Sequence, residues 1–270
     1  MANLWLLRAA FLFWIFTAAL TQLSLFQGKD ALRKASRVTS WAGLLFLCLF
    51  LVRRFQTVGL PLGSFFDSLI FLAWGMGIVH VSVSSRPERQ SLAAMLSPLV
   101  VMTLAIAGLL PAAGQAGGAL LDRRLLVLHV MLILIGYSAF ALSFVCASFY
   151  ILVERLLKSK RFAHWITQLP SLVVLDRIGY RSVVVGFVFL TAGLLSGFIG
   201  VRGTAGASLT DPKIILSGIM WLVYAIYLIL RAGAGWQGRQ VNRLLLFGFA
   251  VMIATYFGGS YLSPGAHRFW

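Results

Sequence analysis

Charged residues are scarce in this sequence, and acidic residues are the scarcest of all. Only 11% of the 270 residues are charged, with 7 Asp and Glu against 23 Lys and Arg, whereas an ordinary soluble domain has about 25%. Hydrophobic residues make up 60% of the chain and its mean hydropathy is +0.92. This composition excludes an ordinary soluble domain and predicts a polytopic membrane protein.

Motifs of several common function classes are also missing. The two cysteines, Cys48 and Cys146, stand in apolar runs outside any CxxC or Cys/His cluster, so they indicate neither a redox compartment nor a zinc site. No nucleotide-binding loop, catalytic triad or nucleophile elbow is visible, so no catalytic residue is predicted. The net charge of +16 does not predict nucleic-acid binding, because the basic residues lie between apolar segments. Anionic lipid headgroups are the partner we expect for them.

What the chain has in abundance is long apolar runs. A run of roughly 20 apolar residues suits a membrane-spanning helix, whereas a barrel strand needs about 10. We therefore predict an all-α protein with a single membrane domain over residues 1–270. The first run lacks a signal-peptide cleavage site and is expected to stay in the mature protein. Eight spans are predicted, at about residues 4–26, 38–53, 63–83, 91–110, 125–153, 181–201, 213–231 and 243–262.

Basic residues predict the orientation of these spans. Most of the 23 Lys and Arg residues follow the first, third, fifth and seventh spans, and positively charged loops stay in the cytoplasm. Both termini are therefore expected on the extracytoplasmic side, in a bacterial inner membrane. The cytoplasmic segment 155–180 mixes charges with Trp165 and several leucines, which is typical of an amphipathic interfacial segment and also of a solvated loop.

One histidine stands at the head of the longest apolar run. His129 lies a few residues after Arg124, and an ionisable residue inside a span is a functional candidate. The predicted topology places it on the same outer surface as His267, and two imidazoles there could be the axial ligands of a haem iron. The pattern alone favours a simpler interpretation, in which His129 is hydrogen-bonded at the interface and His267 is solvated.

Three further residues lie in the third span, with Asp67 near its outer end and Trp74 deeper. Asp67 is the one acid well inside an apolar run, and it fits either a proton or ion site or a carboxylate that receives hydrogen bonds from a neighbouring helix. The second interpretation is favoured. Trp74 fits either the bundle core or the lining of a porphyrin cleft, and His80 is expected toward the cytoplasm.

Four segments resemble the cytochrome c assembly proteins of the CcsA, CcmC and HemX group, in the same order along the chain. GSFFDSLIFLAWGMGIVHV is similar to the family's NLYESLIFLSW helix with its following Ile-His, and LHVMLILIGYSAFALSFVCASFYILVERL is similar to the helix that begins with HV. DPKIILSGIMWLVYAIYLILRAGAGWQGR resembles DPKETWAFITWLIYAIYLHTR followed by GW-G-R. NRLLLFGF with the closing PGAHRFW resembles the last helix and its GLHSY. The four matches cover most of residues 60–270.

The resemblance implies a membrane protein that handles haem, and b-type haem is the expected cofactor. His129 and His267 match the two external histidines that ligate haem in the full synthases. The family's tryptophan-rich platform WGSYWSWDPKE appears as TAGASLTDPKI, so that Asp211 and the two residues after it remain while the tryptophans are lost. The intramembrane haem-ligating histidine of YLHTR is Ile229 here. Each lost aromatic contact removes on the order of 1 kcal/mol of stacking.

These departures resemble the reduced HemX-like (YpjD-like) branch more than a working synthase. The predicted function is therefore a haem-binding accessory protein of cytochrome c biogenesis or haem metabolism, and the degenerate motif argues against an enzyme. Expected partners are haem, membrane lipids and other cytochrome c assembly proteins. A haem-independent adaptor that regulates glutamyl-tRNA reductase abundance is the alternative. A small-molecule transporter is the second alternative, although the spans hold few midplane charges.

Overall fold

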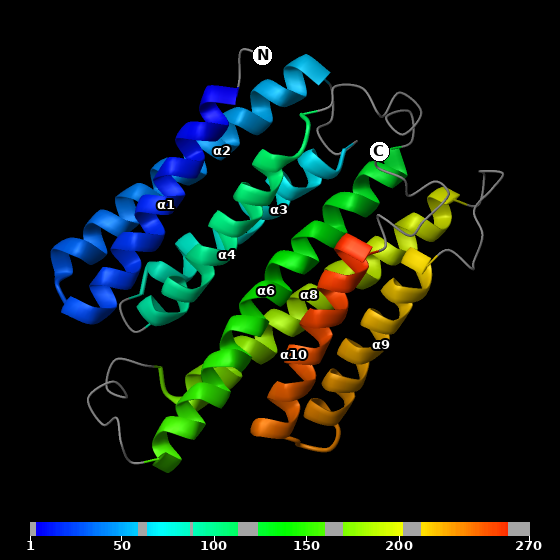
Figure 1. Cartoon of the computed structure of the whole chain (residues 1–270). Coiled ribbons are helices and arrows are strands. Elements are labelled where there is room, and N and C mark those ends of the chain that lie inside the picture. Colours follow the sequence, from blue (N-terminus) through cyan, green and yellow to red (C-terminus); the bar gives the residue numbers. More distant parts are fainter. Residues whose placement is uncertain are drawn as a thin grey trace. The chain divides into compact units, whose positions relative to one another are not determined.

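The computed structural model shows an all-helical chain (Figure 1). It describes residues 4–58, 64–86, 89–112, 124–159, 170–201 and 212–258. Eight helices in these ranges are long and apolar enough to cross a membrane, which confirms the predicted all-α fold with about eight spans. The elements are α1 (Leu4–Gln27), α2 (Asp30–Val58), α3 (Phe65–Ser84), α4 (Gln90–Leu109), α6 (Arg124–Ser159), α8 (Leu172–Val201), α9 (Pro212–Ala232), α10 (Arg239–Ile253) and the π-helix η2 (Ala254–Gly258).

Several helices extend beyond the apolar runs that predicted them. α2 begins at Asp30, eight residues before the expected span. Its first turns are basic and lie outside the apolar run, but their backbone is helical. Both ends of the segment expected at 155–180 belong to long helices, since α6 continues to Ser159 and α8 already begins at Leu172. Hydropathy marks the apolar part of a helix and not its ends. Residues 160–169 lie outside the described part of the chain.

The chain divides into two compact units. Unit 1 contains α1 to α4, and unit 2 contains α6, α8, α9, α10 and η2. Within each unit, helices that follow one another in the sequence pack side by side. The predicted single membrane domain over residues 1–270 stays a prediction.

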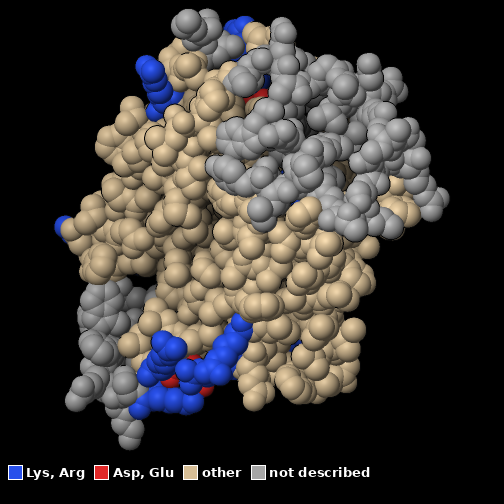
Figure 2. All heavy atoms as spheres, turned by 45° about the vertical axis from the view of Figure 1, so that its right-hand side comes forward, with Lys and Arg blue, Asp and Glu red and all other residues tan. Residues whose placement is uncertain are grey.

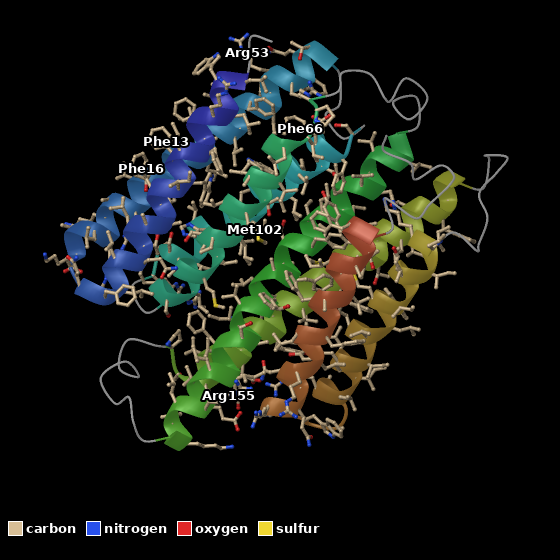
Figure 3. The ribbon with its side chains drawn as sticks, in the orientation of Figure 1. Phe13, Phe16, Arg53, Phe66, Met102 and Arg155 are labelled. Carbon is tan, nitrogen blue, oxygen red and sulfur yellow. The ribbon has the colours of Figure 1, made fainter. Side chains whose placement is uncertain are left out.

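Trp14 is the largest fully buried side chain of unit 1. It is 0% exposed, and two glycines on other helices make room for its indole. A Cβ atom built on Gly43 of α2 would lie 2.9 Å from Trp14 Nε1, and one built on Gly77 of α3 would lie 2.8 Å from Trp14 Cζ2. Outward-facing side chains such as Phe16, which is 58% exposed, give α1 its apolar outer face (Figure 3).

Buried polar side chains connect α1, α2 and α4 in unit 1. Thr17 donates a hydrogen bond to Thr39 at 2.9 Å, and the amide of Gln22 donates to the Ala94 carbonyl at 2.9 Å. Such interhelical hydrogen bonds stabilise the packing of spans, where the hydrophobic effect gives little preference between lipid and protein neighbours.

Unit 2 is built on the close crossing of α6 and α8. A Cβ atom on Gly136 of α6 would lie 3.0 Å from the Gly186 carbonyl oxygen of α8, so the two backbones almost touch. Phe140, which is 0% exposed, stacks on Tyr224 of α9 with 3.7 Å between ring centroids. Phe144 stacks on Phe249 of α10 at 4.1 Å. Small residues at the first crossing and aromatic pairs at the others therefore hold the four helices together.

Replacing Gly186 with alanine should destabilise unit 2. The new Cβ atom would lie 2.6 Å from Phe140 Cε1 and 3.1 Å from the Gly136 carbonyl oxygen. Because the Phe140 ring is fully buried against Tyr224, it cannot move aside cheaply, and we expect a loss of about 1–3 kcal/mol. Thermal unfolding in detergent would measure it.

Gly218→Ala is the matched control for this substitution. Gly218 also lies within a helix, but nothing approaches its ideal Cβ position within 4 Å. Alanine there should be neutral or stabilising, by up to about 1 kcal/mol. Equal melting temperatures for Gly186→Ala and Gly218→Ala would contradict the proposed close packing of α6 on α8.

Candidate functional site

His129 lies in the second turn of α6 and packs against α8. Its Nδ1 atom is 2.6 Å from the carbonyl oxygen of Gly193, which is 64 residues away in sequence. A carbonyl oxygen can only accept a hydrogen bond, so Nδ1 carries the proton and donates it. In the neutral ring the lone pair then belongs to Nε2. This is the tautomer of a metal-ligating histidine whose second nitrogen is held by a backbone carbonyl.

Small residues on α8 create the space for the imidazole ring. A Cβ atom on Gly197 would lie only 2.4 Å from His129 Nδ1, and a Cβ atom on Gly193 would lie 2.7 Å from Ile133 Cγ1. The Ser196 hydroxyl donates to the same Gly193 carbonyl at 2.7 Å. The ring therefore packs directly against α8, and any residue larger than glycine at position 197 would clash with it.

The π-helix η2 lies toward the same end of unit 2 as His129. Tyr256 of η2 meets the ring of Tyr137, two turns along α6 from His129, at 6.0 Å between ring centroids. Tyr137 and Tyr256 are both buried, with exposed fractions of 3% and 9%. A π-helical turn is rare and is often found at functional sites. The N-terminal part of α6 thus combines an oriented imidazole with buried aromatic rings about two turns away.

The other predicted site residues are not assembled around His129 in the described part of the chain. His267 and Asp211 lie outside the described residues. Trp74 belongs to α3 of unit 1, where its ring lies 5.4 Å from that of Phe71. Among the described residues, no group of three His, Cys, Asp or Glu side chains could hold a metal ion. His129 is therefore the one predicted ligand whose geometry can be described.

Ile229 and His80 lie in opposite environments, the first exposed and the second fully buried. Ile229, at the place of the family's intramembrane histidine, is 67% exposed on the outer face of α9. His80 is 0% exposed, and its ring meets the edge of Trp14 at 5.2 Å between centroids.

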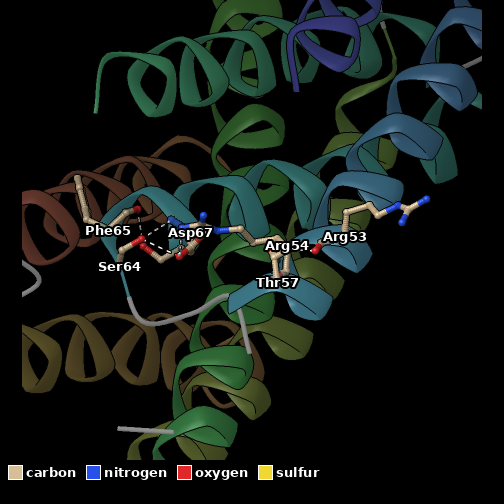
Figure 4. A network of polar contacts seen from close by, with 7 residues as sticks. Arg53, Arg54, Thr57, Ser64, Phe65 and Asp67 are labelled. Carbon is tan, nitrogen blue, oxygen red and sulfur yellow. Dashed lines mark hydrogen bonds and ion pairs between the residues drawn. The ribbon is translucent and has the colours of Figure 1, made fainter. Parts of the chain in front are cut away.

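Asp67 is held in a buried network between α2 and α3 (Figure 4). Arg54 donates to its carboxylate from Nε at 2.9 Å and from Nη2 at 3.2 Å. Ser64, the residue before α3, donates from its hydroxyl at 2.8 Å and accepts from the Asp67 backbone N–H at 3.1 Å. The carboxylate thus receives hydrogen bonds from a neighbouring helix, while Ser64 caps the N-terminus of α3. This agrees with the favoured interpretation of Asp67, a structural carboxylate.

Sequence reasoning missed the residues that orient His129. Gly193, Ser196 and Gly197 stand at the helical spacing that places small residues on one face. That spacing indicates a close helix contact, but it does not name the helix that approaches. Only the structure shows that the contact is made by His129 and Ile133.

Comparison with known proteins decides the family. The model of the family described as "Cytochrome C assembly protein" matches residues 62–267. The chain belongs to this family. The family assignment confirms the resemblance seen in the four sequence segments, and together with the eight apolar helices it supports a multi-pass membrane protein of cytochrome c assembly.

Relatives within the cytochrome c assembly family align over most of the chain. The cytochrome c biogenesis protein CcsA of Prochlorococcus marinus (strain NATL1A) is 28% identical over 291 residues, which covers 97% of this chain and 92% of that protein. CcsA of Chlorella vulgaris is 28% identical over 278 residues, covering 90% of this chain and 88% of that protein.

A solved structure shares the fold of this family member. The structure named "Cytochrome c Heme Lyase CcmF" superposes with a TM-score of 0.70 at 17% identity. The match covers 98% of this chain and 47% of that one, so this chain spans about half the length of the lyase. At this identity the likeness shows a common fold.

The Asp67 network generates a prediction for stability. Asp67→Asn removes the carboxylate that compensates the charge of Arg54, whose side chain is only 12% exposed. Losing one partner of a buried ion pair costs about 3–5 kcal/mol, so the variant should melt well below the unmodified protein. Thermal unfolding in detergent measures the loss.

Asp30→Asn serves as the control. Asp30 pairs with Arg33 at 3.3 Å, but the side chains are 83% and 32% exposed. An exposed pair of this kind contributes less than about 1 kcal/mol. If both substitutions lowered the melting temperature equally, the structural importance of the Arg54–Asp67 pair would be refuted.

Proposed function

We propose that this protein is a haem-binding accessory protein of cytochrome c assembly, with His129 as one axial ligand of the iron. The observation that carries the proposal is the hydrogen bond from His129 Nδ1 to the Gly193 carbonyl at 2.6 Å. It leaves the lone pair on Nε2 and fixes the orientation of the ring, which are the two properties that an axial ligand requires. The donor at this position therefore fits a haem iron.

The second axial ligand in this proposal is His267, and the cofactor is b-type haem. Support for His267 comes from the sequence, because PGAHRFW matches the family's terminal histidine segment. Haem when bound would offer its iron to the two imidazoles, and its apolar macrocycle suits a position against span ends. Tyr137 and Tyr256, packed against each other about two turns from His129, support the fold at this end of unit 2. Asp211 is proposed as a further contact of the cofactor, and the role of Trp74 of unit 1 in lining a porphyrin cleft stays a prediction.

An accessory role, of the HemX-like kind, is proposed over a synthase. A residue that cannot ligate iron, Ile229, occupies the place of the family's intramembrane histidine and is 67% exposed. Thr204, Ser208 and Thr210 occupy the tryptophan positions of the platform in the sequence. Without these rings the chain has less surface on which to hold haem open to an apocytochrome. We therefore assign haem binding or delivery to this chain and not thioether formation.

The proposed orientation has both termini on the outer side of a bacterial inner membrane. Within unit 1, Lys29 lies in the turn after α1 and Lys34 in the first turns of α2, and Arg86 lies in the turn after α3. Within unit 2, the turn between α9 and α10 is flanked by Arg231 and Arg239. These turns follow the odd-numbered spans, so their charges support a cytoplasmic position. His129, at the other end of its unit, would then face outward.

A haem-independent adaptor is the second candidate function, and its proposed partner is glutamyl-tRNA reductase. What favours it is the concentration of basic side chains at the end of unit 2 where α6 ends. The transporter alternative is less well supported, since α8 continues without a break through Gly193 and Gly197 over Leu172–Val201. A transport site would need a broken helix near the membrane midplane.

The absorbance spectrum of the purified, haem-supplied protein tests the main proposal. We expect a Soret band that His129→Ala weakens strongly and that the double variant His129→Ala, His267→Ala removes. Added imidazole should restore part of the band in His129→Ala, because it replaces the missing ligand without replacing any fold contact. A double variant that keeps the full Soret band would overturn the assignment of both ligands.

Gly197→Ala tests the orienting contact itself. The added Cβ atom would lie 2.4 Å from His129 Nδ1, so the ring must leave the Gly193 carbonyl. Loss of such a supporting hydrogen bond lowers metal affinity about 10–100-fold, which a haem titration would detect. Gly218→Ala, with open space around its Cβ position, should bind haem normally. Equal affinities for the two variants would show that the Gly193 contact does not prepare His129.

A deletion strain distinguishes the haem-independent adaptor function from the haem-binding function. If this chain controls reductase abundance without haem, the double histidine variant restores that abundance as well as the unmodified protein does. If haem binding is required, the double variant fails to restore it although the protein is present in the membrane. Immunoblots of the reductase and of this protein provide both measurements.

A further inference from the structure

Basic side chains gather at the end of unit 2 where α6 and α9 end and where α8 and α10 begin, here called the basic end (Figure 2). Seven cations and two carboxylates of the described residues lie there, which leaves an excess of five positive charges. The cations are Arg155, Lys158, Arg177, Arg181, Arg231, Arg239 and Arg243, and the carboxylates are Glu154 and Asp176. Figure 3 shows Arg155 at this end of α6.

Both carboxylates are already engaged by a cation. Glu154 accepts from Lys158 one turn later on α6 at 2.7 Å. Asp176 of α8 pairs with Arg231 of α9. Lys158 and Arg231 are neutralised in this way, which leaves the other five cations of the basic end without an ion pair in the described part of the chain.

Arg231 also fixes the turn between α9 and α10. It donates to the Trp236 carbonyl at 3.0 Å, and its guanidinium lies 5.7 Å from the centre of the Tyr180 ring. The Trp236 N–H in turn donates to the Leu230 carbonyl at 3.1 Å. Trp236 is 45% exposed on this ordered turn. A tryptophan in such a place is typical of the boundary between lipid headgroups and hydrocarbon.

Arg239 and Arg243 are arranged differently from Arg231. They stand one turn apart on α10, and neither forms an ion pair with any carboxylate in the described part of the chain. α10 packs here against α6, since a Cβ atom on Gly238 would lie 3.7 Å from the Tyr150 hydroxyl oxygen. The Nε atom of Arg239 is buried without a hydrogen-bond partner. Glu154 of α6, which already pairs with Lys158, lies within electrostatic range of both arginines. One negative charge therefore faces three positive charges, and a further anion would stabilise the remaining excess.

Apolar surface continues directly from these arginines along α10. Residues 239, 243 and 247 share one face of the helix because they are four residues apart. Phe247 on that face is 56% exposed. The distance from residue 239 to residue 247 along the helix axis is about 12 Å. A phosphate bound at the arginines would therefore place its acyl chain on the side of Phe247. Charge and apolar surface therefore follow the order of groups in a phospholipid.

We propose that the basic end of unit 2 binds one anionic phospholipid, with its phosphate at Arg239 and Arg243 and an acyl chain along Phe247. Guanidinium groups suit this role because they hold phosphate oxygens through two parallel N–H bonds. The exposed apolar face below the arginines favours a lipid over an acidic protein, which would cover charge without covering Phe247. The site is independent of the proposed haem ligands, which lie toward the other end of α6.

Native mass spectrometry of the full chain in mild detergent tests this site. The protein is mixed with equal amounts of phosphatidylglycerol and phosphatidylcholine, and the retained lipid is counted. We expect phosphatidylglycerol to be retained preferentially. The preference should fall about fivefold for each arginine removed in Arg239→Gln, Arg243→Gln. Arg243→Gln alone, at an exposed position, gives the same direction of change if the double variant does not fold.

Arg177→Gln, Arg181→Gln is the matched control. These two exposed arginines also stand one turn apart at the basic end, on α8, and their removal changes the net charge equally. The control should retain phosphatidylglycerol like the unmodified protein. Equal losses in both double variants would show that net charge alone causes the effect and would overturn the site. No loss of phosphatidylglycerol in either variant would also overturn it. Displacement of the lipid by soluble glycerol phosphate would show that a free phosphate suffices and would overturn the role of the acyl chain.

Discussion

The close approach of α6 to α8 is the constraint on which unit 2 depends. Gly136 and Gly186 bring the two backbones together, and the same approach continues to Gly193 and Gly197, where it meets His129. Lipid competes equally for apolar side chains, so small residues and hydrogen bonds decide which spans associate. The packing that assembles the unit therefore also orients its imidazole.

Unit 1 solves the same problem with different groups. Its glycines accommodate a single indole, Trp14, and its polar side chains pair between helices. At one end, a bidentate contact between Arg54 and Asp67 joins α2 to α3. A charge pair in this position is stabilising only because each group finds its full set of partners. The glycines of unit 1 thus admit one large ring, whereas those of unit 2 admit a neighbouring backbone as well as the rings of Phe140 and His129.

The sequence predicts the helices of this protein well and their ends poorly. Apolar runs identified the eight spans because the bilayer imposes their length, but it imposes nothing on helical turns that continue into water, as at Asp30 and Ser159. His129 was recognisable because it is an ionisable residue in an apolar run. Its partner was not, because the acceptor is a backbone carbonyl and every residue has one. Likewise, helix phase and not composition decides that Arg54 turns inward while its neighbour Arg53 points away (Figure 4).

The carbonyl that holds His129 has a consequence for how this protein can evolve. A side-chain acceptor disappears with one codon change, whereas the oxygen of residue 193 persists whatever amino acid is encoded there. A substitution on α8 can therefore displace the imidazole through volume, by enlarging a residue that faces it. Lineages that keep glycine at 197 inherit the ring orientation, and a lineage that loses this glycine loses it in a single step.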